Sequence, residues 1–219
     1  MFWIYFLYFI IYSFIGWSIE VIDKFFEFKR FINRGFLIGP ICPVYGYGVL
    51  AILLVTGNNT SDPLSVFLKS ILICSVLEYS TSYFMEKIFK ARWWDYSKNK
   101  FNINGRICLE TMLPFGILGS LVVYFIHPFI KSILSNFSNG LLLTISIVLF
   151  IIYLIDNIIS FNVMNKIKKE IKKQKEDSTE LIRKKVLEFI DANSILYRHI
   201  KNAFPKFKIY DWVKDKIIK

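Results

Sequence analysis

The sequence predicts an all-α protein that crosses a membrane several times. Of its 219 residues, 54% are hydrophobic and 18% are aromatic. The apolar residues form runs long enough to cross the roughly 30 Å hydrocarbon layer of a bilayer. Charged residues gather between these runs and at the C-terminal end of the chain. This distribution is typical of polytopic integral membrane proteins.

Five apolar runs predict five transmembrane helices, at about residues 2–22, 37–56, 64–89, 107–130 and 141–161. We expect the first run to be retained as a helix, because it has no basic region before it, no small-residue cleavage site, and ends in Glu20 and Asp23. Residues 1–163 would then form the transmembrane domain. Residues 164–219 would form a cytoplasmic basic tail that is helical and amphipathic.

The basic residues between the runs predict the orientation. They lie after the first run and around the end of the third, whereas residues 57–63 contain none. The positive-inside rule then places the N-terminus outside and the C-terminus in the cytoplasm. The abundance of Ile, Lys, Asn and Phe is typical of an AT-rich genome, so we expect a bacterial plasma membrane. The basic residues of the two groups are Lys24, Lys29, Arg30 and Arg34, and Lys87, Lys90, Arg92, Lys98, Lys100 and Arg106.

The second run begins irregularly. Residues 33–48 contain four glycines and two prolines, Pro40 and Pro43. Proline lacks a backbone donor and glycine weakens a helix, so we predict a broken or re-entrant beginning. Irregular backbone at membrane depth is tolerated where protein covers it or where it lines a polar cavity. The alternative is that the glycines serve close packing between helices.

Polar residues follow one face of two predicted helices. In the third run they are Ser75, Glu78, Tyr79, Ser82 and Glu86, and in the first run Tyr5, Tyr12, Gly16, Glu20 and Asp23. Carboxylates inside a membrane generally face a bundle interior or a water-filled cavity, and Glu78 is the deepest of them. The alternatives are a structural glutamate that locks helices together, and ion pairs of Glu20 and Glu86 with loop arginines.

The loop between the third and fourth runs interleaves aromatic, basic and amide side chains. Trp93, Trp94 and Tyr96 suit the headgroup layer, and an interfacial belt alone would explain them. Arginine suits phosphate or carboxylate, so the arginines could bind an anionic lipid headgroup or form internal salt bridges. We predict a cytoplasm-facing polar cavity for a solute or such a headgroup. Its candidate residues are Glu20, Arg34, Glu78, Glu86, Arg92, Trp94, Asp95, Tyr96, Asn102 and Arg106.

Residues 166–219 carry sixteen Lys and Arg against eight Asp and Glu, which is +8 of the net charge of +11. Ile182, Val186, Phe189, Ile190 and Ile200 recur at helical spacing among basic residues, and Tyr210, Trp212, Val213 and Ile217 form a second, shorter apolar edge. Such a helix lies either on anionic lipid or in a hairpin that folds on itself or on the loops. Because the tail is tethered at the membrane, we expect its basic residues to bind membrane lipids rather than nucleic acid.

Several ordered motifs resemble one family. They are Tyr12–Glu20 (YSFIGWSIE), Asn33–Pro40 (NRGFLIGP) with Pro43–Gly46 (PVYG), Trp93–Ser97 (WWDYS) and Asn102–Leu109 (NINGRICL). Over about the first 130 residues the chain resembles the putative ABC-transporter type IV permease family, also called CmpB-like. The resemblance implies a polytopic permease component. The sequence contains no G-x-x-x-x-G-K-[ST] motif, so ATP-driven transport would require a separate ATPase subunit. Five spans are few for a transport path, so we also expect a homo-oligomer or a hetero-complex.

The sequence contains no recognisable catalytic set. His127 and His199 lie apart from the carboxylates, and neither G-x-S-x-G nor H-E-x-x-H occurs. We therefore expect no cofactor and no metal site. Three hypotheses remain open: a transporter permease-like component, a membrane-embedded enzyme that acts on a lipid headgroup, and a membrane assembly or regulatory scaffold.

Overall fold

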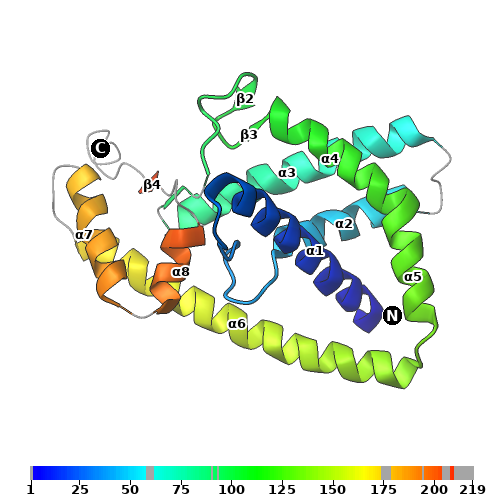
Figure 1. The fold of residues 1–219 in the computed structure, drawn as a ribbon. Helices are drawn as coiled ribbons and strands as arrows, with labels where there is room; N and C mark the ends of the chain where they lie inside the picture. The colour runs from blue at the N-terminus through cyan, green and yellow to red at the C-terminus, as the bar shows by residue number, and fades with distance from the viewer. Residues whose placement is uncertain are drawn as a thin grey trace.

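A computed structural model describes residues 2–57, 62–89, 91–92, 94–173, 179–193, 195–203 and 208–209. Within these ranges it confirms the all-α membrane class, with long apolar helices and only two-residue strands (Figure 1). The helices are α1 (Phe2–Phe28), α2 (Pro43–Thr56), α3 (Pro63–Phe89), α4 (Leu109–Leu121), α5 (His127–Ser135), α6 (Asn139–Lys173), α7 (Thr179–Ala192) and α8 (Ile195–Ala203). A π-helical turn, η1 (Val122–Ile126), joins α4 to α5.

The strands are short and lie at one end of the molecule. Strands β2 (Asn102–Ile103) and β3 (Ile107–Cys108) form an antiparallel hairpin. Strand β1 (Ala91–Arg92) pairs antiparallel with β4 (Lys208–Ile209). In Figure 1 helices α7 and α8 and strand β4 lie on the left, and the β2–β3 hairpin lies at the top; together with residues 29–42 we call this region the polar end.

Four helical stretches of the described chain are long and apolar enough to cross a membrane: Phe2–Phe28, Pro63–Phe89, Leu109–Ser135 and Asn139–Glu170. The predicted span at 37–56 corresponds to α2, which has 14 residues. At 1.5 Å per residue it is about 21 Å long, which is less than the hydrocarbon thickness. Residues 29–42 are not helical, so the broken beginning predicted from glycine and proline is confirmed. The number of spans stays a prediction.

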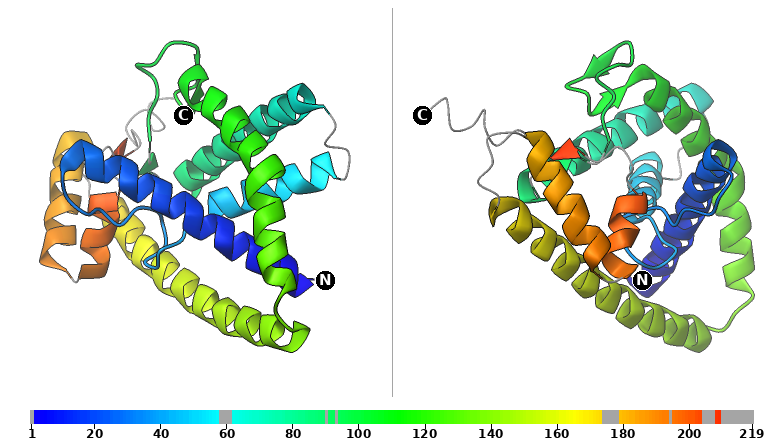
Figure 2. Two further views of the ribbon diagram at one scale, coloured as in Figure 1. Left: turned by 45° about the vertical axis from the view of Figure 1, so that its right-hand side comes forward. Right: turned by 60° about the vertical axis from the view of Figure 1, so that its left-hand side comes forward.

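The helices pack side by side in the order α4, α3, α2, α1 and α6 (Figure 2). Helix α6 borders α1 and leaves most of its apolar surface exposed. Exposed aliphatic side chains on a long helix suit contact with lipid tails. The bundle therefore has a packed interior formed by α1, α2, α3 and α4, and a peripheral helix, α6, that ends at the polar end.

Glycine allows the close contact between α1 and α2. A Cβ atom at Gly46 would overlap Ser13 Oγ and would lie 2.6 Å from the Phe9 carbonyl oxygen. Gly48, two residues later, has more room, because a Cβ there would lie 3.6 Å from Cys74 Sγ. Close packing is thus one use of the glycines in the second apolar run.

Helices α7 and α8 bury their apolar faces against the bundle. Val186, Ile190 and Ile200 join a core cluster with Phe89 of α3 and Met164 of α6. This contact favours the second of the two alternatives for the tail, a hairpin that folds onto the rest of the protein. Helix α6 runs without a break through the predicted domain boundary at 163/164. The second apolar edge, from Tyr210 to Ile217, lies outside the described residues.

We predict that Gly46→Ala destabilises the protein by about 1–3 kcal/mol, because α1 and α2 must move apart to admit a methyl group. Gly48→Ala is the matched control in the same helix, and it should be neutral or slightly stabilising. Thermal unfolding in detergent, followed by tryptophan fluorescence, measures both. Equal melting temperatures for the two variants would contradict the packing described here.

Candidate functional site

A carboxylate from α6 holds the non-helical segment before α2. Asp156 accepts hydrogen bonds from the backbone N–H groups of Ile38 (2.9 Å) and Gly39 (2.8 Å), and from the hydroxyl of Ser160 (3.1 Å). Gly39 is needed at this contact, because a Cβ atom would lie 2.9 Å from Asp156 Oδ2. Three donors thus converge on one carboxyl group, which attaches the segment to α6.

Other side chains bind two backbone carbonyls of this segment. Asn33 Nδ2 donates to the Ile38 carbonyl (2.7 Å), and Trp17 Nε1 of α1 donates to Asn33 Oδ1 (2.6 Å). His199 Nε2 of α8 donates to the Leu37 carbonyl (3.0 Å), which assigns the proton to that nitrogen. The segment therefore connects α1, α6 and α8 through its own backbone.

Glu20 and Arg34 form the first ion pair of the polar end. Arg34 contacts Glu20 Oε2 at 3.2 Å, and the Tyr45 hydroxyl of α2 donates to Glu20 Oε1 (2.7 Å). Arg34 also donates to the carbonyl of Ala203, the last residue of α8. A cation at a helix C-terminus is favourable, because the unpaired carbonyls there carry partial negative charge. Arg34 thus joins α1 to α8.

Glu78 lies in α3 beside this pair. Its Oε1 accepts from the Tyr96 hydroxyl (3.2 Å), whereas Oε2 is buried and accepts no hydrogen bond within the described structure. The Thr111 side chain is close to this carboxyl group, but its hydroxyl donates to the Cys108 carbonyl (2.9 Å). Burial, and next the Glu78 charge, raise the pKa of Tyr96, so its phenol remains a donor.

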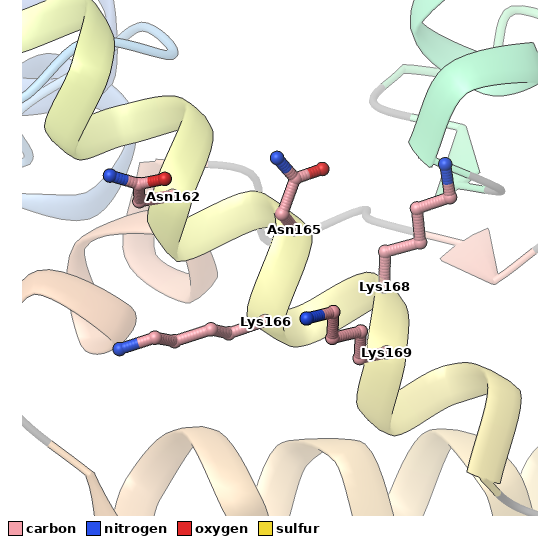
Figure 3. A pocket seen from close by; sticks show the side chains of 5 residues that line it. All are labelled: Asn162, Asn165, Lys166, Lys168 and Lys169. Carbon is pink, nitrogen blue, oxygen red and sulfur yellow. The ribbon is translucent and has the colours of Figure 1, made fainter.

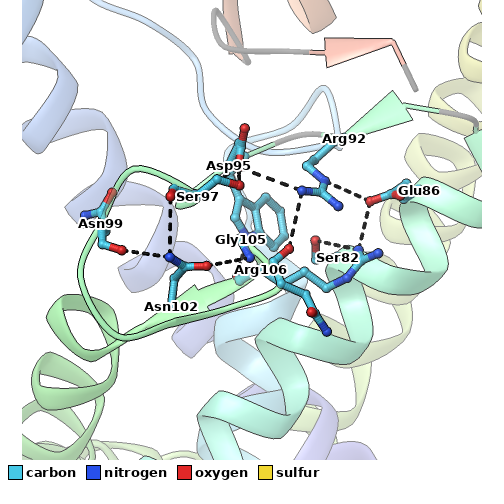
Figure 4. Close-up of polar contacts among 11 residues, drawn as sticks. Ser82, Glu86, Arg92, Asp95, Ser97, Asn99, Asn102, Gly105 and Arg106 are labelled. Atoms are coloured by element: carbon cyan, nitrogen blue, oxygen red, sulfur yellow. Dashed lines mark hydrogen bonds and ion pairs between the residues drawn. The ribbon is translucent and has the colours of Figure 1, made fainter. Parts of the chain in front are cut away.

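Glu86 forms the second set of ion pairs, with two arginines (Figure 4). Its Oε2 lies 2.9 Å from Arg92 Nε and 2.9 Å from Arg106 Nη1. Glu86 is only 7% exposed, and Arg106 is 8% exposed. The rings of Tyr79 and Tyr83 flank the Arg106 guanidinium at 5.6 and 5.4 Å, in the range of cation–π contact. Removing one member of such a buried set leaves an unpaired charge, which costs about 3–5 kcal/mol.

The loop that carries these arginines is held by its own polar contacts. Asn102 Nδ2 donates to the Asn99 carbonyl (2.8 Å), and Asn102 Oδ1 accepts from the Gly105 N–H (3.0 Å). Gly105 has a φ of 66°, and a Cβ atom there would overlap Ser97 Oγ. Asp95 accepts from the backbone N–H of Ser97 (3.0 Å). The loop is therefore a folded cap on α3.

Eight of the ten predicted site residues thus form two neighbouring groups at the polar end, and the other two, Trp94 and Asn102, support the loop. Glu20 and Arg34 form one group with Glu78 and Tyr96. The carboxylates of Glu20 and Glu78 are both close enough to the Tyr96 phenol to raise its pKa. Glu86, Arg92 and Arg106 form the other group with Asp95, whose Oδ1 lies 3.8 Å from Arg92 Nη1. Trp94 and Asn102 support the loop, since Trp94 Nε1 donates to the Arg106 carbonyl (3.0 Å). Trp93 lies outside the described residues.

Of the two alternatives for the arginines, this arrangement favours internal salt bridges over binding of an anionic headgroup. Arg34, Arg92 and Arg106 each contact a carboxylate of the protein itself. No cluster of three or more His, Cys, Asp or Glu side chains suited to a metal occurs in the described part of the chain. The chemistry that the groups offer is polar binding and electrostatic positioning.

Sequence reasoning did not find Asp156, Tyr45 or His199 as partners at this end. One signal pointed to Asp156, because it is the sole charged residue in the apolar run 141–161. No comparable signal marked Tyr45 or His199. Their roles depend on which helices become neighbours in the folded chain.

A family model described as Putative ABC-transporter type IV matches residues 7–161. The chain belongs to this family. The match includes all ten candidate residues and Asp156, and it continues beyond the first 130 residues that carry the resemblance in the sequence. Helices α7 and α8 lie outside it. No curated protein and no solved structure matches the chain. The family match and the long apolar helices together identify the protein as a membrane component related to ABC transporters.

The docking of α8 in this family member should weaken in acid. Burial lowers the pKa of His199, and the carbonyls of Leu37 and Gly35 and the charge of Asp156 offset this only in part. A released α8 binds a proton at the ordinary histidine pKa of about 6.5, so docking is strongest above that pH and weakens as the pH falls through this range.

Hydrogen exchange of residues 195–203 at about pH 7.5 and pH 5.5 measures this effect. Exchange at the lower pH, corrected for its intrinsic rate, should be faster in the wild type and unchanged in His199→Gln. His127→Gln, which removes the other histidine, should behave as the wild type. The same pH response in His199→Gln would contradict the prediction.

Proposed function

We propose that this protein is the permease-like membrane component of a transporter, and that it binds a polar solute at Glu78. The proposal rests on one observation above all: Glu78 Oε2 is buried and accepts no hydrogen bond from the described residues. Leaving such a group without a partner costs about 1–3 kcal/mol. A solute that donates a hydrogen bond to Oε2 removes this cost.

A second group supports a solute with both donor and acceptor atoms. Arg106 Nε is buried and has no hydrogen-bond partner within the described structure. It can donate to an acceptor, whereas Glu78 Oε2 can accept from a donor. An anionic lipid headgroup fits this place less well, because the charges of Arg92 and Arg106 are already paired with Glu86.

We place the polar end in the cytoplasm and the N-terminus outside a bacterial plasma membrane. The basic residues that follow α1 and α3 support this orientation through the positive-inside rule. In this arrangement residues 37–42 and α2 together make a fifth crossing, and the rest of the polar end lies in the cytoplasm. Their internal hydrogen bonds make such a crossing compatible with the hydrocarbon layer.

We further propose that a separate ATPase subunit docks on the polar end, either on one chain or on a homo-oligomer. The β2–β3 hairpin supports a docking surface there, because Phe101, just before β2, and Ile103, in β2, are 79% and 51% exposed. Exposed apolar side chains on a rigid loop can insert into a partner. No contact among the described residues favours the other two hypotheses, a membrane-embedded enzyme and an assembly scaffold.

Purification of the full chain from its native membrane in mild detergent tests the proposal. Mass spectrometry should find a companion subunit that carries G-x-x-x-x-G-K-[ST], and small molecules that are retained by the wild type. Glu78→Gln should lose these molecules and keep the subunit. Glu110→Gln, an exposed carboxyl in the first turn of α4, is the matched control and should retain both. Identical small molecules in wild type and Glu78→Gln, without an ATPase partner, would contradict the proposal.

A further inference from the structure

An open pocket of about 410 Å³ lies on α6, just beyond the predicted apolar span (Figure 3). The described side chains that line it come from two turns of one helix: Asn162, Asn165, Lys166, Lys168 and Lys169. Figure 3 shows Lys166 and Lys169 extending toward the same side of α6. All five side chains present N–H donors, and the nearest carboxylate in the sequence, Glu170, does not line the pocket. The pocket is therefore positively charged.

These donors have no partner among the residues that the structure describes. None of the five side chains forms a hydrogen bond or an ion pair with another described residue. The segment 166–219, which includes the three lysines, carries sixteen Lys and Arg against eight Asp and Glu, a net charge of +8. Like charges three and four residues apart on a helix repel each other, so an anion that binds here lowers the energy of the helix.

The face of α6 that carries the pocket is apolar in the turns that precede it. Ile151, Ile155 and Ile158 precede Asn162 and Asn165 at spacings of three and four residues, so they lie on one stripe of the helix. They are 51%, 52% and 62% exposed. A stripe that begins with exposed isoleucines and ends in amides and ammonium groups matches one lipid molecule, with acyl chains beside the isoleucines and an anionic headgroup in the pocket.

We propose that this face of α6 binds one acidic phospholipid, whose phosphate occupies the pocket between Lys166 and Lys169. The isoleucine stripe distinguishes this ligand from free phosphate, which gains nothing from apolar contact. The site is separate from Glu78 and does not depend on transport. It places the anionic headgroup at lysines that have no partner among the described residues, whereas the arginines of the polar end are bound to Glu20 and Glu86.

Native mass spectrometry of the full chain in detergent, titrated with phosphatidylglycerol or phosphatidylcholine, tests this site. Each lysine near an anionic surface contributes about fivefold to affinity, so Lys166→Gln/Lys169→Gln should weaken phosphatidylglycerol binding by about 30-fold. Lys131→Gln/Lys184→Gln removes the same charge elsewhere and should have little effect. Lys166→Arg/Lys169→Arg keeps the charge and should bind as the wild type, which shows that the positions tolerate substitution.

Three results would overturn the proposal. One is equal binding of the two lipids by the wild type, since phosphatidylcholine has no net charge. Another is an equal loss of affinity in the two glutamine double variants, which would indicate general charge attraction. The third is full displacement of phosphatidylglycerol by inorganic phosphate at equal concentration, which would make free phosphate the ligand.

Discussion

Backbone groups inside a membrane protein have no bulk water to bind, so residues 37–42, which leave the helical conformation, require partners from the rest of the chain. Asp156 supplies the main one, because its carboxylate receives the N–H groups of both Ile38 and Gly39. This contact attaches the peripheral helix α6 to the interior of the bundle. Asn33 and His199 hold the carbonyls of the same segment, and they extend the attachment to α1 and α8.

The charged groups of the polar end build on this framework. Arg34 lies in the non-helical segment, pairs with Glu20 of α1 and reaches the last carbonyl of α8. Glu86 fixes the loop through Arg92 and Arg106. Buried ion pairs contribute little net stability, but their geometry specifies which elements meet. Among the described residues, the buried atoms without a hydrogen-bond partner are Ser13 Oγ, Ser75 Oγ, Glu78 Oε2 and Arg106 Nε. The two that belong to charged side chains, together with the lysines of the α6 pocket, are the groups most suited to a ligand.

Local pattern predicted the features that depend on local physics. The third run, 64–89, agrees with α3 at Pro63–Phe89, and Ser75, Ser82 and Glu86 on its polar face are all buried. Pro40 and Pro43 indicated the broken helix. The start of α2 could not be predicted from hydropathy, because the predicted span 37–56 includes residues 37–42. The backbone of these residues is not helical and bonds to other parts of the chain instead. The pairings of Asp156 and His199 join residues more than 110 positions apart, and one sequence holds no signal for such contacts.

Hydrogen exchange of residues 33–42 in Asp156→Asn tests the central claim most directly. The asparagine keeps one acceptor and turns a donor toward the backbone N–H groups, so the Ile38 and Gly39 amides should exchange at least about tenfold faster than in the wild type. Asn157→Ala is the neighbouring control, because the Asn157 amide bonds only within its own helix, to the Tyr153 carbonyl (2.7 Å). Unchanged protection of Ile38 and Gly39 in Asp156→Asn would contradict the account.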